Sequence, residues 1–319
     1  MTGAVVTIPT AADFAGEPLK ASASTPLADQ AGYHVELMER LASTGRYDRP
    51  RKTRVFVVAN QKGGVGKTTT SVNLAAAMAA RGLSVLLIDL DPQGNASTAA
   101  AIPHGSGTPG TYEVLLDALP IQEAIQTSPD VPGLRVVPAT IDLAGAEIEL
   151  VMLEQRERRL RTAIDDYLAG PGRDIDYVFI DCPPSLGLLT VNAMVAAREV
   201  LIPIQCEYYA LEGLSQLLGN IELVQQHLNS DLDVSTILLT MHDARTNLSS
   251  SVAAEVRGHF GDRVLSTAIP RSVRISEAPG YQQTIITYDP NSTGALSYLE
   301  AAREITERGA ALAQQGASS

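Results

Sequence analysis

A glycine-rich loop between an apolar run and a helix-forming run constrains the fold of this chain more than any other feature. The apolar run covers residues 55–59 and is typical of a buried strand, whereas residues 71–81 are rich in alanine and predict a helix that ends before Gly82. Small residues let backbone N–H groups close around phosphate oxygens, and a helix N-terminus adds a favourable dipole. The order of strand, loop and helix therefore predicts a phosphate-binding loop. Its residues are Lys62, Gly63, Gly64, Val65, Gly66, Lys67, Thr68 and Thr69.

The start of this loop differs from the usual phosphate-loop pattern, G-x-x-x-x-G-K-[ST]. Gln61 stands where that pattern has its first glycine, and an additional lysine, Lys62, follows it. A lysine here points away from its own helix and can reach a nucleotide held by a second subunit, where it would supply charge as an arginine finger does. The alternative is a lysine that faces solvent. Within its own subunit, Lys67 is expected to lie along the β- and γ-phosphates.

Two further apolar runs end in carboxylates that fit the same site. The first ends at Asp89 and Asp91. Asp91 is expected to position or polarise the attacking water and to contribute to the metal site, although Asp-Pro is also a common turn. Asp89 either supports the loop lysine or the metal site, or it has a purely structural role. The sequence favours neither alternative. Asp181 ends the second run and is expected to bind Mg²⁺, either directly or through a water molecule. The Thr68 hydroxyl is expected to bind the same ion.

Composition is typical of a soluble globular protein in a reducing compartment. The chain has 319 residues, of which 45% are hydrophobic, so it can bury a large core. No apolar run approaches the roughly 20 residues that span a bilayer, and the N-terminus lacks the pattern of a secretory signal. The only cysteines, Cys182 and Cys206, lack a metal-binding spacing and are expected to be small buried side chains in a cytoplasmic protein.

The net charge limits how this chain can contact nucleic acid. A formal charge of −12 argues against a generally basic surface, so any DNA contact must come from a local patch. The chain has no tryptophan and only 4% aromatic residues, which argues against a platform for stacking bases. Residues 236–281 carry five arginines against four carboxylates, so folding must sort the positive groups onto one face.

The first part of the chain differs from the rest. Residues 1–53 are expected to be an N-terminal extension to a domain that covers residues 54–319. Residues 1–32 are rich in Ala, Thr, Ser and Pro and are predicted to be disordered, whereas residues 33–41 predict a short amphipathic helix. The basic stretch at 46–54 is either a solvated linker or an auxiliary contact to DNA or a partner.

From residue 54 onward, short apolar runs alternate with helical segments. This alternation predicts an α/β fold with a mostly parallel twisted sheet and helices on both faces, as in P-loop NTPases. Right-handed crossovers would place the ligand at the carboxyl edge of the strands. The predicted strands cover residues 55–60, 85–89, 134–138, 177–181, 200–204, 236–241 and 264–268. The predicted helices cover residues 68–81, 143–168, 188–197, 211–228, 250–260 and 293–313.

Several blocks in the same order resemble the ParA/Soj chromosome- and plasmid-partitioning ATPases, in the deviant Walker A group that also contains MinD. The resemblance runs from about residue 54 to the C-terminal helix. The blocks are NQKGGVGKTT at 60–69, DLDPQGN at 89–95, DCPPSLG at 181–187, YYALEGL at 208–214, LTMHDARTNL at 239–248 and IPRSVRISEAP at 269–279.

The resemblance implies an ATP-dependent sandwich dimer with Mg²⁺ as cofactor. Lys62 would cross the interface, Gly63 would need to stay small there, Lys67 would bind phosphate in its own subunit, and Asp91 would serve hydrolysis. The adenine would lie near Met241, Pro270 and Arg271.

The same resemblance implies the partners. ATP-bound homodimers would bind double-stranded DNA nonspecifically through Arg245 and Arg274 and release it after hydrolysis. A centromere-binding protein of the ParB type would stimulate that hydrolysis. The alternative for both arginines is an exposed or ion-paired side chain. The protein would be cytoplasmic and associated with the nucleoid, and its N-terminal extension leaves room for a polar or scaffold partner.

Two other functions are compatible with a P-loop chain. A MinD-like membrane switch needs a basic amphipathic anchor at the C-terminus. The tail from Thr293 instead carries Arg303 and Arg308 against three glutamates, so we expect no membrane contact.

A metabolic ligase that phosphorylates a small carboxylate is permitted by the fold. The blocks at 243–245 and 270–271 favour partitioning.

Overall fold

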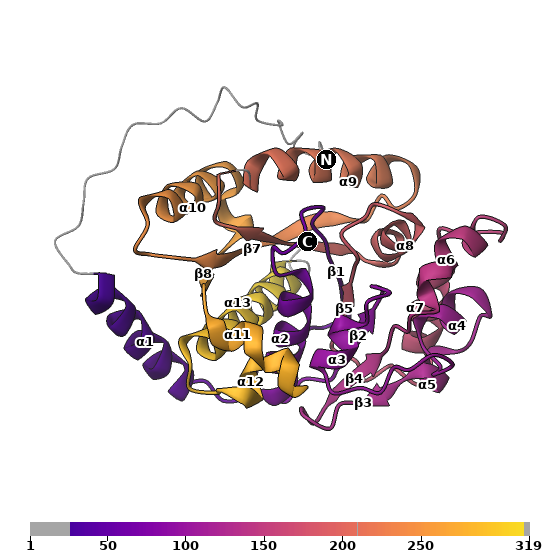
Figure 1. Ribbon diagram of the computed structural model, residues 1–319, viewed down its shortest axis with the longest axis horizontal. Helices are drawn as coiled ribbons and strands as arrows, with labels where there is room; N and C mark the ends of the chain where they lie inside the picture. The colour runs from indigo at the N-terminus through magenta and orange to yellow at the C-terminus, as the bar shows by residue number, and fades with distance from the viewer. Residues whose placement is uncertain (1–25, 209, 316–319) are drawn as a thin grey trace.

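The predicted α/β fold is confirmed by a computed structural model, which describes residues 26–208 and 210–315. Its eight-stranded sheet has the order β3-β4-β2-β5-β1-β6-β7-β8, and every neighbouring pair is parallel except β3 and β4 (Figure 1). The strands are β1 (Arg54–Val58), β2 (Val85–Asp89), β3 (Gln126–Thr127), β4 (Leu134–Val137), β5 (Tyr177–Asp181), β6 (Glu199–Gln205), β7 (Asp233–His242) and β8 (Val264–Pro270). All seven predicted strands are present.

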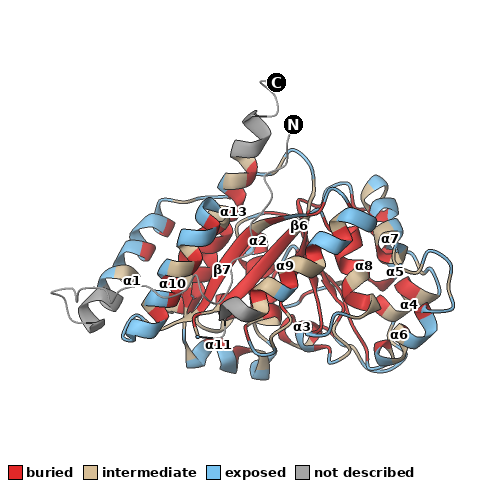
Figure 2. Cartoon of the chain, turned by 90° about the horizontal axis from the view of Figure 1, so that it is seen from above, coloured by how far each residue is buried: buried red, intermediate tan, exposed pale blue. Residues whose placement is uncertain are grey.

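Helices cover both faces of the sheet. Along β1, Val55 and Val57 join the apolar cluster on one face, and Phe56 and Val58 join the cluster on the other, because successive side chains in a strand alternate. Figure 1 shows α8, α9 and α10 on one side of the sheet and α2 and α13 on the opposite side. The strands between them are buried, whereas the outer helix surfaces are exposed (Figure 2). This two-sided burial explains why the strands are continuous apolar runs.

The sequence predicted the longer helices better than the short ones. The helices are α1 (Pro26–Ala42), α2 (Lys67–Ala80), α3 (Asn95–Ala99), α4 (Thr111–Leu116), α5 (Ile121–Ala124), α6 (Leu143–Leu150), α7 (Arg159–Ala169), α8 (Leu188–Ala196), α9 (Ala210–His227), α10 (Asn247–Phe260), α11 (Val273–Glu277), α12 (Ile285–Tyr288) and α13 (Thr293–Gln315). Two 3₁₀ turns, η2 (Gly261–Arg263) and η3 (Ala278–Tyr281), complete the described elements. The elements α3, α4, α5, β3, α11 and α12 are too short to leave a periodic pattern.

The prediction of one helix over residues 143–168 is wrong. The structure has two helices, α6 and α7, with turns between them and Gln155 at a φ of +50°. A residue in this left-handed region interrupts a right-handed helix. Both parts pack on α4 and α8, and α7 also contacts α5, so the break lets the two helices cover the same neighbours along different paths.

The N-terminal extension is partly structured. The predicted short helix is confirmed, but α1 begins at Pro26, so the prediction of disorder is wrong for residues 26–32. Proline suits the first turn of a helix, where its missing N–H has no intrahelical partner. Residues 1–25 lie outside the described part of the chain.

The basic stretch at 46–54 is anchored at Tyr47 and Arg54, whereas the charged side chains between these two residues are exposed. The Tyr47 side chain is buried, and its hydroxyl donates to the Leu299 carbonyl at 2.7 Å. Arg54 begins β1 and pairs with Glu199 at 2.6 Å. This part of the extension therefore packs on the same core as α2 and α13.

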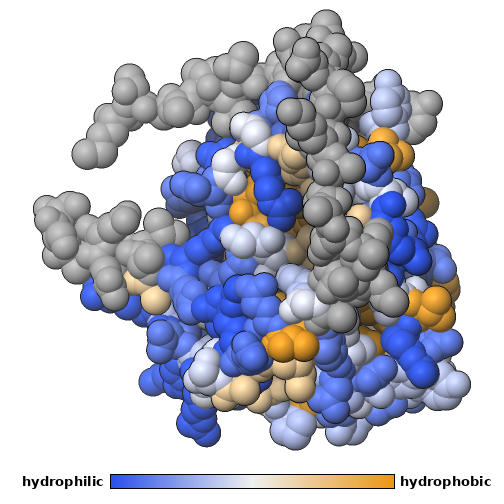
Figure 3. All heavy atoms as spheres, turned by 90° about the vertical axis from the view of Figure 1, so that its left-hand side faces the viewer, coloured by the Kyte–Doolittle hydropathy of each residue, from blue (hydrophilic) through white to orange (hydrophobic). Residues whose placement is uncertain are grey.

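Charged side chains cover part of the open edge of the sheet at β8. Glu304 of α13 accepts hydrogen bonds from the backbone N–H groups of Ser266 and Thr267, both at 2.8 Å. Arg257 and Arg308 donate to carbonyls of the same strand, Ser266 and Val264, each at 2.9 Å. Such pairing occupies backbone groups that would otherwise be free to join another strand. The face that carries α1 and this edge is largely hydrophilic (Figure 3).

Candidate nucleotide-binding site

The loop between β1 and α2 has the backbone geometry of a phosphate cradle. Gly64 and Gly66 have φ values of +75° and +90°, a region that favours glycine. Gly63 and Gly64 are exposed, and a Cβ at either position would meet no atom within 4 Å, so the loop is open beside them. Thr240 of β7 fixes the loop from the side, because its hydroxyl donates to the Val65 carbonyl at 2.9 Å. The cradle is therefore set before any ligand arrives.

Asn60 fixes the entrance of the loop. Its amide nitrogen donates to the Pro203 carbonyl at 2.9 Å, and its Oδ1 accepts from the Lys62 backbone N–H at 3.0 Å. Lys67 follows as the first residue of α2 and is almost completely buried. Its Nζ lies 3.4 Å from the Lys62 carbonyl, which holds the ammonium along the loop. Burial lowers the pKa of Lys67, and the carboxylate of Asp181 opposes that shift.

Asp181 has an unsatisfied oxygen at the end of β5. Its Oδ1 accepts from the Ser71 hydroxyl at 2.8 Å, whereas its Oδ2 is buried without a hydrogen-bond partner. Burial raises the pKa of this carboxyl to about 6, and the hydroxyls of Thr68 and then Ser71 work against the rise. A buried unpaired carboxylate oxygen is costly unless a ligand satisfies it. This oxygen fits a water bound to Mg²⁺, or the ion itself, with Thr68 close by in the first turn of α2.

Asp89 acts as a structural anchor for the segment that carries Asp91. Its Oδ2 accepts from the N–H of Ser97 at 2.9 Å and from the Ser97 hydroxyl at 2.7 Å. Its Oδ1 accepts from the backbone N–H of Asp91 at 3.1 Å. Burial and the neighbouring Asp181 raise the pKa of Asp89 to about 7. These contacts hold the segment after β2 against α3.

Asp91 is only partly buried, which suits a group that must reach a water molecule. Its Oδ1 accepts from the Gln93 N–H at 3.0 Å, so it also forms the turn that the sequence offered as an alternative. The Asp91 charge opposes the lowering of the Lys67 pKa and adds to the rise of the Asp181 pKa. The structure thus brings Lys67, Asp91 and Asp181 into one electrostatic neighbourhood at the carboxyl edge of the sheet.

Lys62 is held by a glutamate that sequence reasoning did not select. Its Nζ lies 3.3 Å from Glu207 Oε2, and the two side chains are 36% and 44% exposed. The other oxygen of Glu207 lies 3.5 Å from Arg271 Nη2. One carboxylate therefore bridges two cations that were both predicted to contact nucleotide. Glu207 directly precedes the YYALEGL block, but nothing in the sequence reveals these two contacts.

The residues predicted to lie near the adenine are found at the carboxyl ends of β7 and β8. His242 is paired with Pro270 across these strands, and the Arg271 N–H donates to the His242 carbonyl at 3.1 Å. Met241 has a φ of +50°, an uncommon conformation for a residue with a side chain. Pro270 and Arg271 also line a cavity of about 710 Å³ beside β8. The structure does not place Met241 among the residues that line it.

The two arginines predicted to contact DNA are exposed and already ion-paired. Arg245 follows β7 and lies 2.8 Å from Asp243, whereas Arg274 in α11 lies 3.5 Å from Glu277 and 3.8 Å from Asp289. Their side chains are 63% and 60% exposed. Hydrogen bonds from Arg245 lower the pKa of Asp243 to about 2. Any phosphate bound here would have to compete with these carboxylates.

The described residues contain neither a preformed metal cluster nor a membrane-spanning helix. Within residues 26–208 and 210–315, no group of three or more His, Cys, Asp or Glu side chains is arranged to hold a metal ion by itself. A Mg²⁺ site that fits this chain would therefore draw several ligands from phosphate and water, as is usual for this ion. Over the same residues, no helix is both long and apolar enough to cross a bilayer.

Comparison with known proteins decides the family. Residues 53–234 match a family model described as an AAA domain. The sporulation initiation inhibitor protein Soj of Bacillus subtilis is 52% identical over 256 residues, which cover 80% of this chain and 99% of that protein. The chain belongs to the ParA/Soj family of chromosome-partitioning ATPases. The chromosome partitioning protein ParA of Myxococcus xanthus, 52% identical over 83% of this chain and 92% of its own length, agrees with this assignment.

Solved structures of similar proteins agree on the fold. A cobyrinic acid a,c-diamide synthase from Mycobacterium smegmatis, solved with an ATP analogue and magnesium, is 41% identical. The alignment covers 78% of this chain and 93% of that protein, with a TM-score of 0.67. The septum site-determining protein MinD from Pyrococcus horikoshii has a TM-score of 0.63 over 79% of this ParA/Soj chain and 96% of its own. It is 22% identical, so it supports the fold alone.

Proposed function

We propose that this ParA/Soj chain segregates DNA through a cycle of ATP binding, dimerisation and hydrolysis. The observation that carries the proposal is the open glycine cradle, which lies beside the buried Lys67 ammonium and the unsatisfied oxygen of Asp181. This arrangement supplies backbone donors and one fixed cation for phosphates and a free carboxylate oxygen for a metal site. Structures similar to this chain were solved with an ATP analogue or ADP and magnesium, which supports the same ligands here.

In this proposal each group has a defined task. Lys67 neutralises the β- and γ-phosphates, and Thr68 and Asp181 hold Mg²⁺, which supplies further positive charge when bound. Asp91 orients the attacking water and completes the outer part of the metal site. Met241, Pro270 and Arg271 contact the adenosine end of the nucleotide. Because the cradle and Asp181 are fixed in advance, little reorganisation is needed when nucleotide binds.

Dimerisation follows from the position of Lys62. Its Nζ is bound to Glu207 across a partly exposed contact, which a triphosphate on a second copy can replace. Gly63 is exposed, and a Cβ there would meet nothing within 4 Å of its own chain. A requirement for glycine at this position would therefore come from the second subunit or its nucleotide. Both features support a homodimer closed around ATP.

DNA binding depends on the dimer in this proposal. Arg245 and Arg274 are exposed, and two copies would present four such side chains on a chain whose formal charge is −12. Doubling the contacts strengthens binding through a higher effective concentration and through counterion release. Contacts to phosphate alone would give little sequence preference. A ParB-type protein would stimulate hydrolysis, and the nucleoid would be the site of action in the cytoplasm.

We also propose that residues 1–53 form an extension to an ATPase domain of residues 54–319. The family model begins at residue 53, which supports this boundary. Recruitment of a polar or scaffold protein remains a role for the extension that a partner search can test.

A metabolic ligase is the second candidate function. The observation that favours it is the 41% identity to a protein described as an amide synthase. Partitioning proteins are more similar, at 52% identity over most of their length. Turnover distinguishes the two functions, because a ligase would hydrolyse ATP only with a small carboxylate present, whereas a partitioning ATPase responds to DNA and a protein partner.

The test measures DNA retention and oligomer size with ADP, with ATP and with a slowly hydrolysed ATP analogue. We expect a monomer with ADP, and a dimer that retains nonspecific duplex with ATP or the analogue. A protein that stays monomeric at saturating nucleotide and Mg²⁺ contradicts the proposal. So does equal DNA retention with and without nucleotide.

A further inference from the structure

A cavity beside β8 joins the N-terminal helix to the predicted adenosine contacts. It has a volume of about 710 Å³, within the range of small-molecule sites. Pro270, Arg271 and His242 form one part of its lining, and Tyr33 and His34 of α1 form another. Although the chain carries a formal charge of −12, none of the described residues that line this cavity is acidic. Such a lining suits the electron-rich base and ribose of a nucleotide more than a cation.

The cavity begins close to the phosphate loop. The Thr240 hydroxyl contacts the Val65 carbonyl at 2.9 Å. His242 lies two residues further along the same strand, roughly 7 Å away, and Pro270 lies opposite it on the next strand, roughly 5 Å further. A nucleoside whose phosphates lie in the loop is long enough to cover the distance from Thr240 to Pro270. It would meet the end of the cavity that His242 and Pro270 line.

Helix α1 is fixed firmly enough to serve as a wall of a binding site. Its residues Tyr33, Leu37 and Leu41 recur every fourth position and so share one face, and the two leucines are buried. Tyr33 packs against the apolar cluster that contains both leucines. His34 adds a polar contact, because its Nδ1 lies 3.1 Å from the Thr293 hydroxyl at the start of α13.

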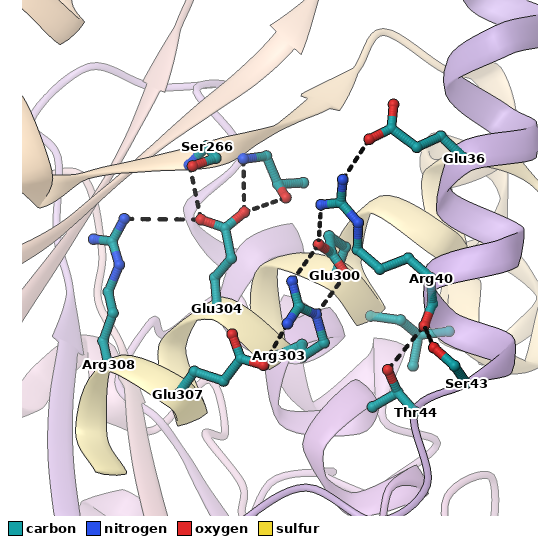
Figure 4. Close-up of polar contacts among 12 residues, drawn as sticks. Glu36, Arg40, Ser43, Thr44, Ser266, Glu300, Arg303, Glu304, Glu307 and Arg308 are labelled. Carbon is teal, nitrogen blue, oxygen red and sulfur yellow. Dashed lines mark hydrogen bonds and ion pairs between the residues drawn. The ribbon is translucent and has the colours of Figure 1, made fainter. Parts of the chain in front are cut away.

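A buried carboxylate locks α1 onto α13 (Figure 4). The Glu300 side chain has no exposed surface, and Oε1 accepts from Arg40 of α1 and from Arg303 of α13, each at 2.7 Å. Arg40 also pairs with Glu36 on its own helix. Removing one partner of such a pair leaves a buried charge uncompensated, which is strongly destabilising. The Glu300 contacts therefore hold α1 in a fixed position beside the cavity.

We propose that α1 forms one wall of the nucleoside pocket, with Tyr33 and His34 contacting the adenosine part of bound ATP. This inference rests on the ATP binding proposed above. It assigns a binding role to a helix that precedes residues 53–234, the part of the chain matched by the family model. The tyrosine ring can stack on the base, and the histidine can hydrogen-bond to the base or ribose.

The absence of tryptophan from the chain permits a direct test. The variant Tyr33→Trp places one indole in the cavity, and Tyr112→Trp places one on α4 as a matched control. ATP with Mg²⁺ should cause a saturable loss of emission in Tyr33→Trp and none in Tyr112→Trp, with calorimetry on the same samples reporting binding. Adding Lys67→Ala to Tyr33→Trp should remove both the calorimetric signal and the emission change.

A second variant keeps the inference testable if Tyr33→Trp does not fold. His34→Ala should raise the Kd for ATP about fivefold, the effect of one lost hydrogen bond. His259→Ala on α10, which does not line the cavity, should leave the Kd unchanged.

Normal ATP affinity in His34→Ala, or unchanged emission of Tyr33→Trp while calorimetry detects binding, overturns the inference and leaves the proposed function intact. An emission change with DNA but not with ATP also overturns it. If the unmodified protein binds no ATP, the proposed function itself fails.

Discussion

Replacing Glu207 by glutamine should make dimerisation easier. In the structure Glu207 holds Lys62 at 3.3 Å and Arg271 at 3.5 Å. Lys62 must leave this contact to reach a nucleotide on a second copy, so the carboxylate competes with the triphosphate. Glutamine keeps the shape of the side chain but removes its charge. Glu207→Gln should therefore lower the free energy needed to release Lys62.

The size of the effect follows from exposure. The Lys62 and Glu207 side chains are 36% and 44% exposed, and partly exposed ion pairs contribute up to about 1 kcal/mol. A gain of about 1 kcal/mol lowers the ATP concentration at half-dimerisation about fivefold. Because salt screens exposed charges, the difference between variant and unmodified protein should shrink as ionic strength rises.

The assay is analytical ultracentrifugation or light scattering across an ATP titration with Mg²⁺, at low and at high salt. Glu222→Gln, which removes a carboxylate on α9, is the matched control and should leave the titration unchanged. A double variant, Glu207→Gln with Lys62→Ala, should lose the gain. If Glu207→Gln needs as much ATP as the unmodified protein, or more, Glu207 does not restrain Lys62 and the reasoning fails.

Three other predictions follow from the site. Lys67→Ala should abolish ATP binding, because it removes the buried cation of the cradle, and calorimetry that still detects normal affinity would contradict its role. Asp91→Ala should bind ATP and dimerise but hydrolyse ATP at least tenfold more slowly, an expected contribution of general-base positioning; normal phosphate release would count against it. Arg245→Glu with Arg274→Glu should weaken DNA binding and reduce its salt dependence while leaving dimerisation intact, whereas an unchanged salt titration would exclude this surface.

The phosphate site shows how far local sequence can predict a site. Residues 62–69 are consecutive, so their order already implies which backbone groups surround a phosphate. Asp181 lies far along the chain, yet it too was predicted, because parallel strands end at the same edge of a sheet. In the structure β1 and β5 are neighbours, and Asp181 reaches Ser71 of α2. Its unsatisfied oxygen became visible only when the surroundings of β5 were known.

Other features depended on packing that no local pattern records. The segment predicted as a single helix over 143–168 breaks near Gln155, so that α6 and α7 can both pack on α4 and α8. Helix α1 begins seven residues before the predicted start at Tyr33 and is held by the buried Glu300, which belongs to α13. The charge of Glu300 can be read from the sequence, but its partner on α1 cannot.

The sequence by itself determined the α/β fold, the phosphate loop and the family, because each depends on the order of residues within short continuous segments. Only the tertiary structure decided that Glu207 bridges Lys62 and Arg271, that the Asp89 carboxyl is occupied by Ser97, and that α1 borders the cavity beside β8. These are contacts between side chains brought together by folding. Their energies depend on burial and distance, which are properties of the packed chain.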